Sequence, residues 1–375
     1  MFRKLIVIIV CFILAGCIAP LIKGGRGDGS EVTFWTLQMN DFAPYMNSVI
    51  AEFEAQNPGM KIKWVDVPFS EGEKRTLAAI LSDNPPDLIN LNPDFSALLA
   101  QRGALQEIDP TQTGQFNQEI LNTLKYNDKL YSLPWYATSA VTIYNKKLLA
   151  SLSVPKTYED LGKIAPVIRQ KTGAYAFMPN LTENDTMPRI LNKYPKDKED
   201  AVFDYFRKLY KEDLIPKESI TQTQREALEK YMSGQIVFLQ AGPNFLLQIK
   251  ENAPATYAET DVAPQITGEL GQNDFSLMNL VIPSRARHKE EALKFALFLT
   301  NEKNQLELAK LTNILAVNQK ALQDEFYTKY DDLPSKARVI SAKQLNKVNP
   351  VFLPARNQKE INTQINLKIQ KLLLD

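Results

Sequence analysis

From Glu31 onward, short runs with strand-like alternation are followed by runs whose apolar residues have helical spacing. Residues 60–67 alternate apolar with polar side chains, which is typical of a half-buried strand, whereas Tyr45, Val49 and Phe53 share one face of a helix. The expected order is strand 32–35, helix 45–53, strand 60–67, helix 73–81, strand 87–91 and helix 95–101. This β-α-β-α-β order predicts an α/β fold with a mostly parallel sheet flanked by helices.

In such sheets, ligands bind beyond the carboxyl ends of the strands. Two polar loops occupy these places, Thr36 to Asp41 and Asn92 to Phe95. Further along, the pattern predicts helices at 158–171, 200–210, 225–232 and 290–299 and strands at 236–239 and 277–282. The last residues, 360–374, have apolar side chains at helical spacing, which predicts a helix that covers a lobe, with membrane-surface binding as the alternative.

The amino terminus combines two basic residues with an apolar run that ends at Leu14, the pattern of a secretory signal. This run is too short for a transmembrane helix, which needs roughly 20 residues. The Leu-Ala-Gly-Cys sequence at 14–17 resembles the bacterial lipobox. We therefore expect residues 1–16 to be removed and Cys17 to be lipidated, with a chance cysteine in an ordinary signal peptide as the alternative. Residues 17–30 are rich in glycine and are expected to form a flexible tether.

Composition argues against several classes of function. Lys and Arg number 44 against 43 Asp and Glu, which leaves no excess of positive charge for a nucleic-acid partner. The one histidine, His288, lies in a charged stretch that is typical of a solvated turn, which argues against Ser-His-Asp hydrolases and multi-histidine metal sites. We expect neither a metal nor another cofactor. Removal of residues 1–16 would leave one cysteine, so the exported protein would have to be stable without an internal disulfide.

Several short motifs occur in a shared order and at matching spacings, and together they resemble the family 1 extracellular solute-binding proteins. These are the sugar-binding lipoproteins and periplasmic proteins of bacterial ABC importers, of maltose-binding-protein type. The resemblance extends from residue 14 to about 320. The motifs are Phe34-Trp35 before a polar loop, Phe53 to Ile62 with Asn57-Pro58-Gly59, Pro86 to Ile89, Leu133-Pro134 with Tyr144 to Leu148, Pro155 to Leu161, Met232 to Ile236 with Gly242-Pro243, and Ile282 to Ser284 before 291–299.

The resemblance implies a two-lobe periplasmic-binding-protein fold of type II. Each lobe is expected to hold a mostly parallel sheet flanked by helices, and the chain is expected to cross between the lobes three times and to close on a ligand in the cleft. The crossings are expected near residues 138–140, 274–277 and 315–318. Lobe 1 would then comprise 31–138 and 277–316, and lobe 2 would comprise 139–276 and 317–375. The protein is expected to be an extracytoplasmic monomer that is anchored to a membrane through lipidated Cys17.

A sugar offers hydroxyl groups and flat C–H faces, so its site needs carboxylates and amides together with aromatic platforms. The resemblance places Gln38 and Asn40 in a ligand-contacting loop, with helix capping by Asn40 or Asp41 as the alternative. Asp94 stands where the family's maltose-binding protein has a sugar-binding carboxylate, although it is also placed to cap a helix. Asn279 is a further candidate amide ligand, and its alternative role is that of a satisfied core amide.

The resemblance also indicates aromatic platforms. Trp135 and Tyr136 are expected beside the cleft, with a buried hinge aromatic as the alternative. Asn244 stands where the family usually has a tryptophan, which makes Phe245 the nearest substitute. Thr138 takes the position of a family acid. These differences favour a ligand other than maltodextrin.

Another family loop, which brings an acid and an aromatic residue in other members, corresponds to Met178-Pro179-Asn180 and Glu183. An anionic ligand would require convergent Arg or Lys side chains. The candidate loops contain none, and Arg189 is only close to one of them in sequence. A neutral saccharide or polyol is therefore favoured over a phosphorylated one.

The function expected from these patterns is capture of a sugar and its delivery to the permease subunits of an ABC importer, without catalysis. One alternative is a glycosidase that uses two carboxylates, because that reaction needs no histidine. No two acids are paired at strand ends as such a site requires. A second alternative is a sensor subunit that presents its bound ligand to a receptor, which the sequence does not separate from transport.

Overall fold

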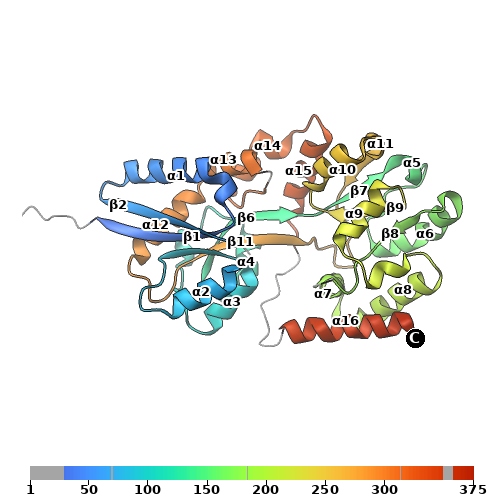
Figure 1. The fold of residues 1–375 in the computed structure, drawn as a ribbon, viewed down its shortest axis with the longest axis horizontal. Coiled ribbons are helices and arrows are strands. Elements are labelled where there is room, and N and C mark those ends of the chain that lie inside the picture. Colours follow the sequence, from blue (N-terminus) through green and yellow to red (C-terminus); the bar gives the residue numbers. More distant parts are fainter. Residues whose placement is uncertain (1–28, 69–70, 184, 313, 349–357) are drawn as a thin grey trace, which may run out of the picture.

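The computed structural model describes residues 29–68, 71–183, 185–312, 314–348 and 358–375. These residues form two lobes, each built on a β-sheet with helices on both faces (Figure 1). The expected signal peptide, the lipidation site Cys17 and nearly all of the expected tether lie outside the described residues.

The first lobe holds a five-stranded sheet in the order β2-β1-β3-β11-β6. Its strands are β1 (Ser30–Leu37), β2 (Met60–Val67), β3 (Leu88–Leu91), β6 (Ser132–Ser139) and β11 (Phe275–Val281). β1 pairs in parallel with β2 and β3, whereas β11 is antiparallel to both of its neighbours, β3 and β6. Every strand of this sheet except β11 therefore points in one direction.

Helices cover both faces of this sheet because the strands carry apolar side chains on both sides. Phe34 and Leu280 belong to the core shared with α1 (Ala43–Gln56) and α12 (Lys289–Leu299). Ile89 and Leu91 belong to the core shared with α2 (Gly72–Leu81) and α3 (Pro93–Gln101). The lobe also contains α4 (Gln118–Thr123), the hairpin β4 (Lys125–Tyr126) and β5 (Lys129–Leu130), α13 (Glu302–Thr312) and α14 (Glu325–Thr328).

The second lobe holds a four-stranded sheet in the order β10-β7-β9-β8. Its strands are β7 (Val141–Asn145), β8 (Tyr175–Phe177), β9 (Ile236–Ala241) and β10 (Thr260–Ala263). β7 is antiparallel to both β10 and β9, and β8 is parallel to β9. The helices of this lobe are α5 (Lys146–Leu149), α6 (Tyr158–Thr172), α7 (Thr186–Leu191), α8 (Glu199–Lys211), α9 (Gln224–Met232), α10 (Phe245–Asn252) and α11 (Pro254–Ala258).

The predicted α/β fold is confirmed, with one refinement: both sheets are mixed, because each contains one reversed strand, β11 or β7. The strand directions also locate the edge of each sheet that meets the other lobe. Since β6 ends where the chain passes to β7, the carboxyl ends of β1, β2 and β3 lie at this junction. The carboxyl ends of β8, β9 and β10 lie there from the other side, because these strands run opposite to β7.

The chain passes between the lobes at 139–141, between β6 and β7, and again over 264–274, between β10 and β11. The third passage differs from the one expected at 315–318. Val317 and Tyr327 lie in the core of the first lobe, where the Tyr327 hydroxyl donates to the Ile314 carbonyl and accepts from the Ala316 amide. The chain therefore stays in the first lobe through Tyr327, and the expected boundary at 316 is corrected.

The helix that follows joins both lobes. In α15 (Leu333–Gln344), Ala337 belongs to a core cluster of the second lobe, while Leu345, just beyond the helix, returns to the core of the first. α15 contacts β10 and β7 as well as β6. Figure 1 accordingly shows α15 above the gap between the two sheets.

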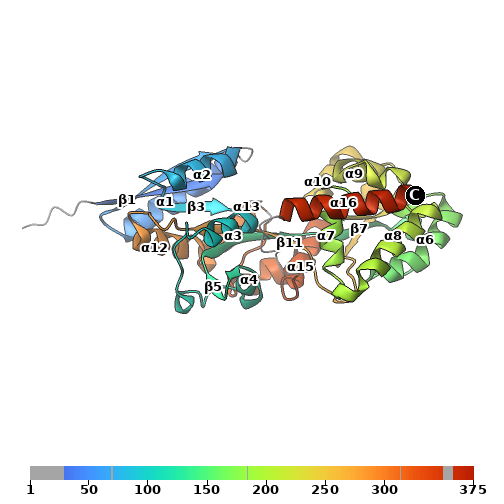
Figure 2. The same cartoon turned by 90° about the horizontal axis from the view of Figure 1, so that it is seen from below.

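The carboxyl-terminal α16 (Gln358–Leu374) lies along α8 and α7 of the second lobe (Figure 2). Ile369 and Leu373 are buried in that lobe's core, whereas Leu367 and Leu374 point to solvent. The prediction of a covering helix is thereby confirmed. Within the described part of the chain, no helix has both the length and the apolar character needed to cross a membrane.

Candidate binding cleft

Two adjoining cavities open at the junction of the lobes, and together we call them the cleft. They enclose about 850 and 1490 Å³ of space that is open to solvent. Five residues line both cavities and therefore mark where the cavities merge: Ala140, Arg189, Gln224, Gln240 and Asp274. This position agrees with the rule that ligands bind beyond the carboxyl ends of strands in α/β sheets.

The loop after β1 lies at the edge of the first lobe that faces the junction, and we call this edge the rim. Asp66, near the end of β2, accepts hydrogen bonds from the Thr36 hydroxyl at 2.6 Å and from the backbone amides of Met39 and Asn40 at 2.9 Å each. The loop is therefore held by a neighbouring strand. The side chain of Asn40 caps no helix, and both it and Gln38 are exposed at the edge that faces the junction.

Asp94 lies on the same rim, in the first turn of α3. The capping residue of this helix is Asn92, whose side chain accepts a hydrogen bond from the Phe95 amide at 2.8 Å, so Asp94 is not the cap. The Asp94 side chain touches solvent, yet surrounding protein desolvates it and raises its pKa. Both Arg189, which opposes this shift, and Asp185, which adds to it, belong to the second lobe. Asp94 thus lies within electrostatic reach of the second lobe, although it lines neither cavity.

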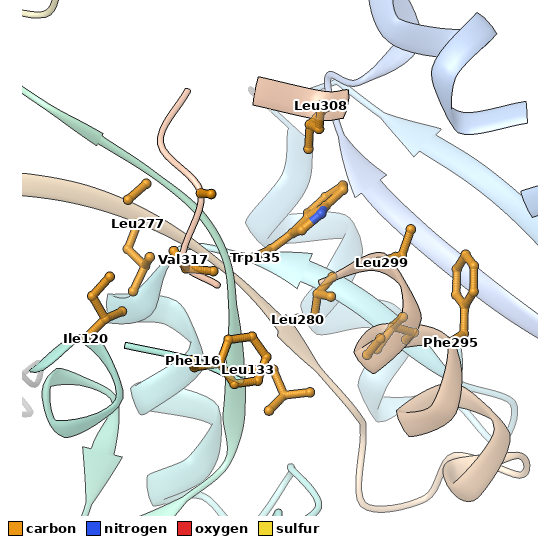
Figure 3. Close-up of a cluster of buried hydrophobic side chains, with 14 of the residues drawn as sticks. Phe116, Ile120, Leu133, Trp135, Leu277, Leu280, Phe295, Leu299, Leu308 and Val317 are labelled. Atoms are coloured by element: carbon orange, nitrogen blue, oxygen red, sulfur yellow. The ribbon is translucent and has the colours of Figure 1, made fainter. Parts of the chain in front are cut away.

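The expected platform residue Trp135 lies elsewhere. Its indole is fully buried among apolar side chains of the first lobe's core, which include Leu280 and Leu308 (Figure 3). The Trp135 ring packs edge to face against Phe34 at a centroid distance of 5.9 Å. The β6–β11 pairing is irregular beside it, at Met278/Asn279, so the alternation of faces cannot be extrapolated from the sequence. The alternative of a buried aromatic fits this placement, and a stacking role for Trp135 is corrected.

Tyr136 and Thr138 differ from Trp135 in exposure. Tyr136 is half-buried, and burial together with the nearby Asp66 carboxylate raises its pKa to about 12. Thr138 is exposed and lines the larger cavity.

Asn279 is fully buried within β11, and its side-chain amide has no hydrogen-bond partner among the described residues. Asn279 is therefore a core residue in this structure and not a residue of the cleft.

The second lobe contributes the loop after β9. Asn244 is exposed, Phe245 is half-buried, and both line the larger cavity opposite Ile314 and Leu315. Gly242 permits this arrangement, because a Cβ atom there would lie 2.5 Å from the Asn244 Oδ1 atom. The structure therefore places both of these candidates in the cleft.

The loop after β8 lines the smaller cavity through Met178, Pro179 and Asn180. Asn180 is buried, and its side-chain amide donates to the Gln222 carbonyl at 2.9 Å. The carboxylate of Glu183 accepts from the Gln224 amide at 2.8 Å. These two polar side chains thus hold the loop and the start of α9.

Three cationic side chains line the cleft, which corrects the expectation that none converge there. Arg189 pairs with Asp185 at 2.6 Å, and Lys193 pairs with Asp274 at 2.6 Å. The third is Arg338 of α15, whose Nε donates to the Phe326 carbonyl at 2.6 Å. Two of the three positive charges are thus balanced by carboxylates of the cleft itself, and these ion pairs offer both donors and acceptors to a neutral polar ligand.

A buried polar network joins the segments that cross at the junction. The Gln344 side-chain amide donates to the Ser139 hydroxyl at 3.0 Å and to the Ala140 carbonyl at 2.8 Å. Its Oε1 accepts from the Gln265 amide at 2.7 Å, and the Gln265 side chain donates to the Asp274 carbonyl at 2.7 Å. We call Ser139, Gln265 and Gln344 the hinge network, because they connect all three crossings.

Sequence reasoning missed several residues of the cleft. Gln240 stands near the end of β9, a position that gives a usable signal, as does that of Asp66, which holds the loop after β1. Lys193 and Arg338 carry no such signal, since packing between segments far apart in the chain brings them to the cleft. Nowhere in the described ranges do three His, Cys, Asp or Glu side chains gather closely enough to hold a metal ion.

Residues 38–306 match the model of the bacterial extracellular solute-binding protein family, and this match covers well over half of the chain. The chain belongs to this family. A multiple sugar-binding protein of Streptococcus mutans is 23% identical to this solute-binding protein over 322 residues, which cover 77% of this chain and 75% of that protein.

Solved structures share the two-lobe fold of this solute-binding protein. A periplasmic-binding protein of Synechococcus sp. MITs9220 aligns with a TM-score of 0.78 and 28% identity, covering 92% of this chain and 93% of that one. The Listeria monocytogenes maltose-binding protein MalE, solved in complex with maltose, aligns with a TM-score of 0.75 and 20% identity, with coverage of 92% and 93%. The architecture is therefore that of type II periplasmic binding proteins.

Proposed function

We propose that this protein captures a neutral saccharide or polyol in the cleft and delivers it to the membrane permease of an ABC importer, with no catalysis of its own. The observation that carries the proposal is a cleft between two lobes in which Arg189 and Lys193 are each paired with a carboxylate. A phosphorylated ligand calls for several convergent cations that are free to pair with it, whereas Arg338 is the one cationic side chain of the described cleft lining that no cleft carboxylate pairs with. The family membership and the sugar-binding relative support the same class of ligand.

The residues proposed to contact the ligand come from both lobes. Gln38, Asn40 and Asp94 lie on the rim of the first lobe, and Thr138 lies at the first crossing. The second lobe offers the following: Asn244 and Phe245 after β9, and Gln224 and Gln240, which line both cavities. Amide and carboxylate groups suit the donors and acceptors of sugar hydroxyl groups, and Phe245, which lines the larger cavity together with the more buried Phe275, offers an aromatic surface for a C–H face.

Thermal shift and calorimetry on protein lacking residues 1–17 test this proposal. The panel comprises glucose, galactose, myo-inositol, maltotriose, raffinose and diacetylchitobiose, with glucose 6-phosphate and glycerol 3-phosphate as anionic members. A ligand at 100 times its Kd should stabilise the protein by about 2.7 kcal/mol. We expect at least one neutral member to do so and the phosphorylated members to have no effect. Stabilisation by phosphorylated members alone, or by none of the panel, would contradict the proposal.

We also propose that the protein acts as a monomer anchored at the outer side of a membrane through lipidated Cys17, as its lipobox-like sequence indicates. Labelled fatty acid fed to cells should be incorporated into the parent protein and not into Cys17→Ser. The variant should also keep its signal peptide or be cut at another position. Continued labelling of Cys17→Ser would show that lipid is attached elsewhere.

A further inference from the structure

Asp274 occupies a distinctive place in the cleft, at the second crossing where the two cavities merge. Its side chain is 26% exposed, and its Oδ2 atom lies 2.6 Å from the Nζ atom of Lys193. Lys193 itself is only 2% exposed. A lysine removed this far from water loses its hydration, and a partner carboxylate offsets that loss only in part. Stability alone is therefore a weak reason for the pair.

The backbone of Asp274 is also fixed. Its amide donates to the Gln265 side chain at 2.9 Å, and its carbonyl accepts from the same side chain at 2.7 Å and from the Ser139 hydroxyl at 3.2 Å. Asp274 is thus held in two places. Its backbone is bound by Gln265 and Ser139 of the hinge network, and its carboxylate is paired with Lys193. Such preorganisation suits a group that must meet a ligand in one geometry.

Lys193 is held in place by the second crossing. The Leu270 amide donates to the Lys193 carbonyl at 3.0 Å, and a Cβ atom at Gly268 would come within 2.6 Å of that carbonyl oxygen. The ammonium group also lies 5.8 Å from the centre of the buried Tyr158 ring. The Lys193 side chain therefore has little freedom, and it directs its charge at Asp274.

We propose that Asp274 binds hydroxyl groups of the saccharide at the floor of the cleft, and that Lys193 is the positioning residue that holds this carboxylate. The inference rests on the proposed function and adds a ligand-binding group at the second crossing. Because the backbone of Asp274 belongs to the same hydrogen-bonded set as the hinge network, a ligand held there contacts the segment about which the lobes move.

The first test compares Asp274→Asn with a matched control, Asp261→Asn, in the full chain in detergent. Asp261 pairs with Lys336 at the same distance, 2.6 Å, and is also 26% exposed, but it lines neither cavity. The probe is the panel saccharide that calorimetry shows to bind the parent most tightly. We expect Asp274→Asn to weaken its binding by about 10- to 150-fold and Asp261→Asn to leave it unchanged. Equal binding by the parent and Asp274→Asn would overturn the inference.

The second test separates ligand contact from a purely structural pair. Monodeoxy analogues of the probe each remove one hydroxyl group. At the position that Asp274 contacts, the parent should lose affinity and Asp274→Asn should lose none further. Lys193→Met should weaken saccharide binding when it is introduced into the parent. It should cause no further loss when it is combined with Asp274→Asn, because Lys193 acts through the Asp274 carboxylate. If Lys193→Met does not fold, the analogue series on Asp274→Asn still decides.

The outcomes distinguish the two proposals. Losses that are spread evenly over all analogues in both proteins would mean that Asp274 only supports the fold, and the inference would fail. A parent protein that binds no member of the panel would contradict the proposed function and remove the basis of this inference. If the parent binds a panel member and Asp274→Asn loses affinity for the same analogues as the parent does, this inference is contradicted and the proposed function is not.

Discussion

At the scale of single residues, Asp94 combines exposure to solvent with desolvation by the protein that surrounds it. The side chain can exchange contacts with water for contacts with a ligand, because it is exposed. Its raised pKa means that the folded protein holds the Asp94 proton more tightly than the unfolded chain does. The charged form therefore disfavours folding at neutral pH, and this contribution disappears as the pH falls below the unfolded value.

Asp94→Asn should accordingly weaken saccharide binding without loss of stability. We expect affinity to fall by about 10- to 150-fold, because a charge-assisted hydrogen bond is lost. The free energy of unfolding in urea should equal or exceed that of the parent at pH 7, and the two proteins should converge as the pH falls toward 4. Calorimetry and urea titrations at several pH values measure both effects.

Asn92→Ala is the control for the helix. It removes the cap of α3 and should lower the free energy of unfolding by about 0.5–2 kcal/mol. If Asp94→Asn were destabilising at pH 7 and bound saccharide like the parent, Asp94 would have a structural role and not a binding role.

Position along a strand is what the sequence reveals at the scale of single residues, while ligand contact by the residues so placed stays a prediction. Gln38, Asn40 and Asp94 follow strands, and the structure places all three on the rim. The expectation for Trp135 failed, because the irregular pairing beside it sets which way its ring points, and pairing between distant strands is not visible in one chain. Lys193 could not be predicted either, because packing between segments far apart in the chain brings it to the cleft and to Asp274.

At the scale of elements, α16 shows what periodicity alone can establish. Its buried side chains, Ile369 and Leu373, recur at helical spacing and lie in the core of the second lobe. Lys368 of the same helix pairs with Glu199 and Asp200 of α8 at 3.1 and 3.2 Å. The amphipathic pattern thus predicted both the helix and its covering role. It could not predict β7 and β11 as reversed strands, because strand direction depends on non-local pairing.

Ile369→Ala tests the attachment of α16. This residue is completely buried, so its truncation should lower the free energy of unfolding by about 2–5 kcal/mol. Leu367 in the same helix is 52% exposed, and Leu367→Ala should change stability by no more than about 0.5 kcal/mol. Urea unfolding compares the two variants. Similar small effects for both would show that α16 contributes little to the stability of the lobe.

At the scale of the whole molecule, the hinge network and α15 connect the lobes. Gln344 bonds to the first crossing and Gln265 to the second, so movement of one lobe must rearrange or pivot about a buried polar set. The resemblance placed crossings near 138–140, 274–277 and 315–318, whereas in the structure the first lies at 139–141, the second spans 264–274 and the third follows Tyr327. The reason for the third difference is that Tyr327 and Leu345 pack into the first lobe's core, which local patterns do not reveal.

We expect a neutral saccharide to bind between the lobes and to draw them together. Small-angle X-ray scattering on protein lacking residues 1–17, with and without a saturating concentration of the panel saccharide that calorimetry identifies, tests it most directly. We expect a smaller radius of gyration with the saccharide, because hinge closure about the crossings brings the lobes together. A radius of gyration that does not change, under conditions in which calorimetry shows full occupancy, would contradict it.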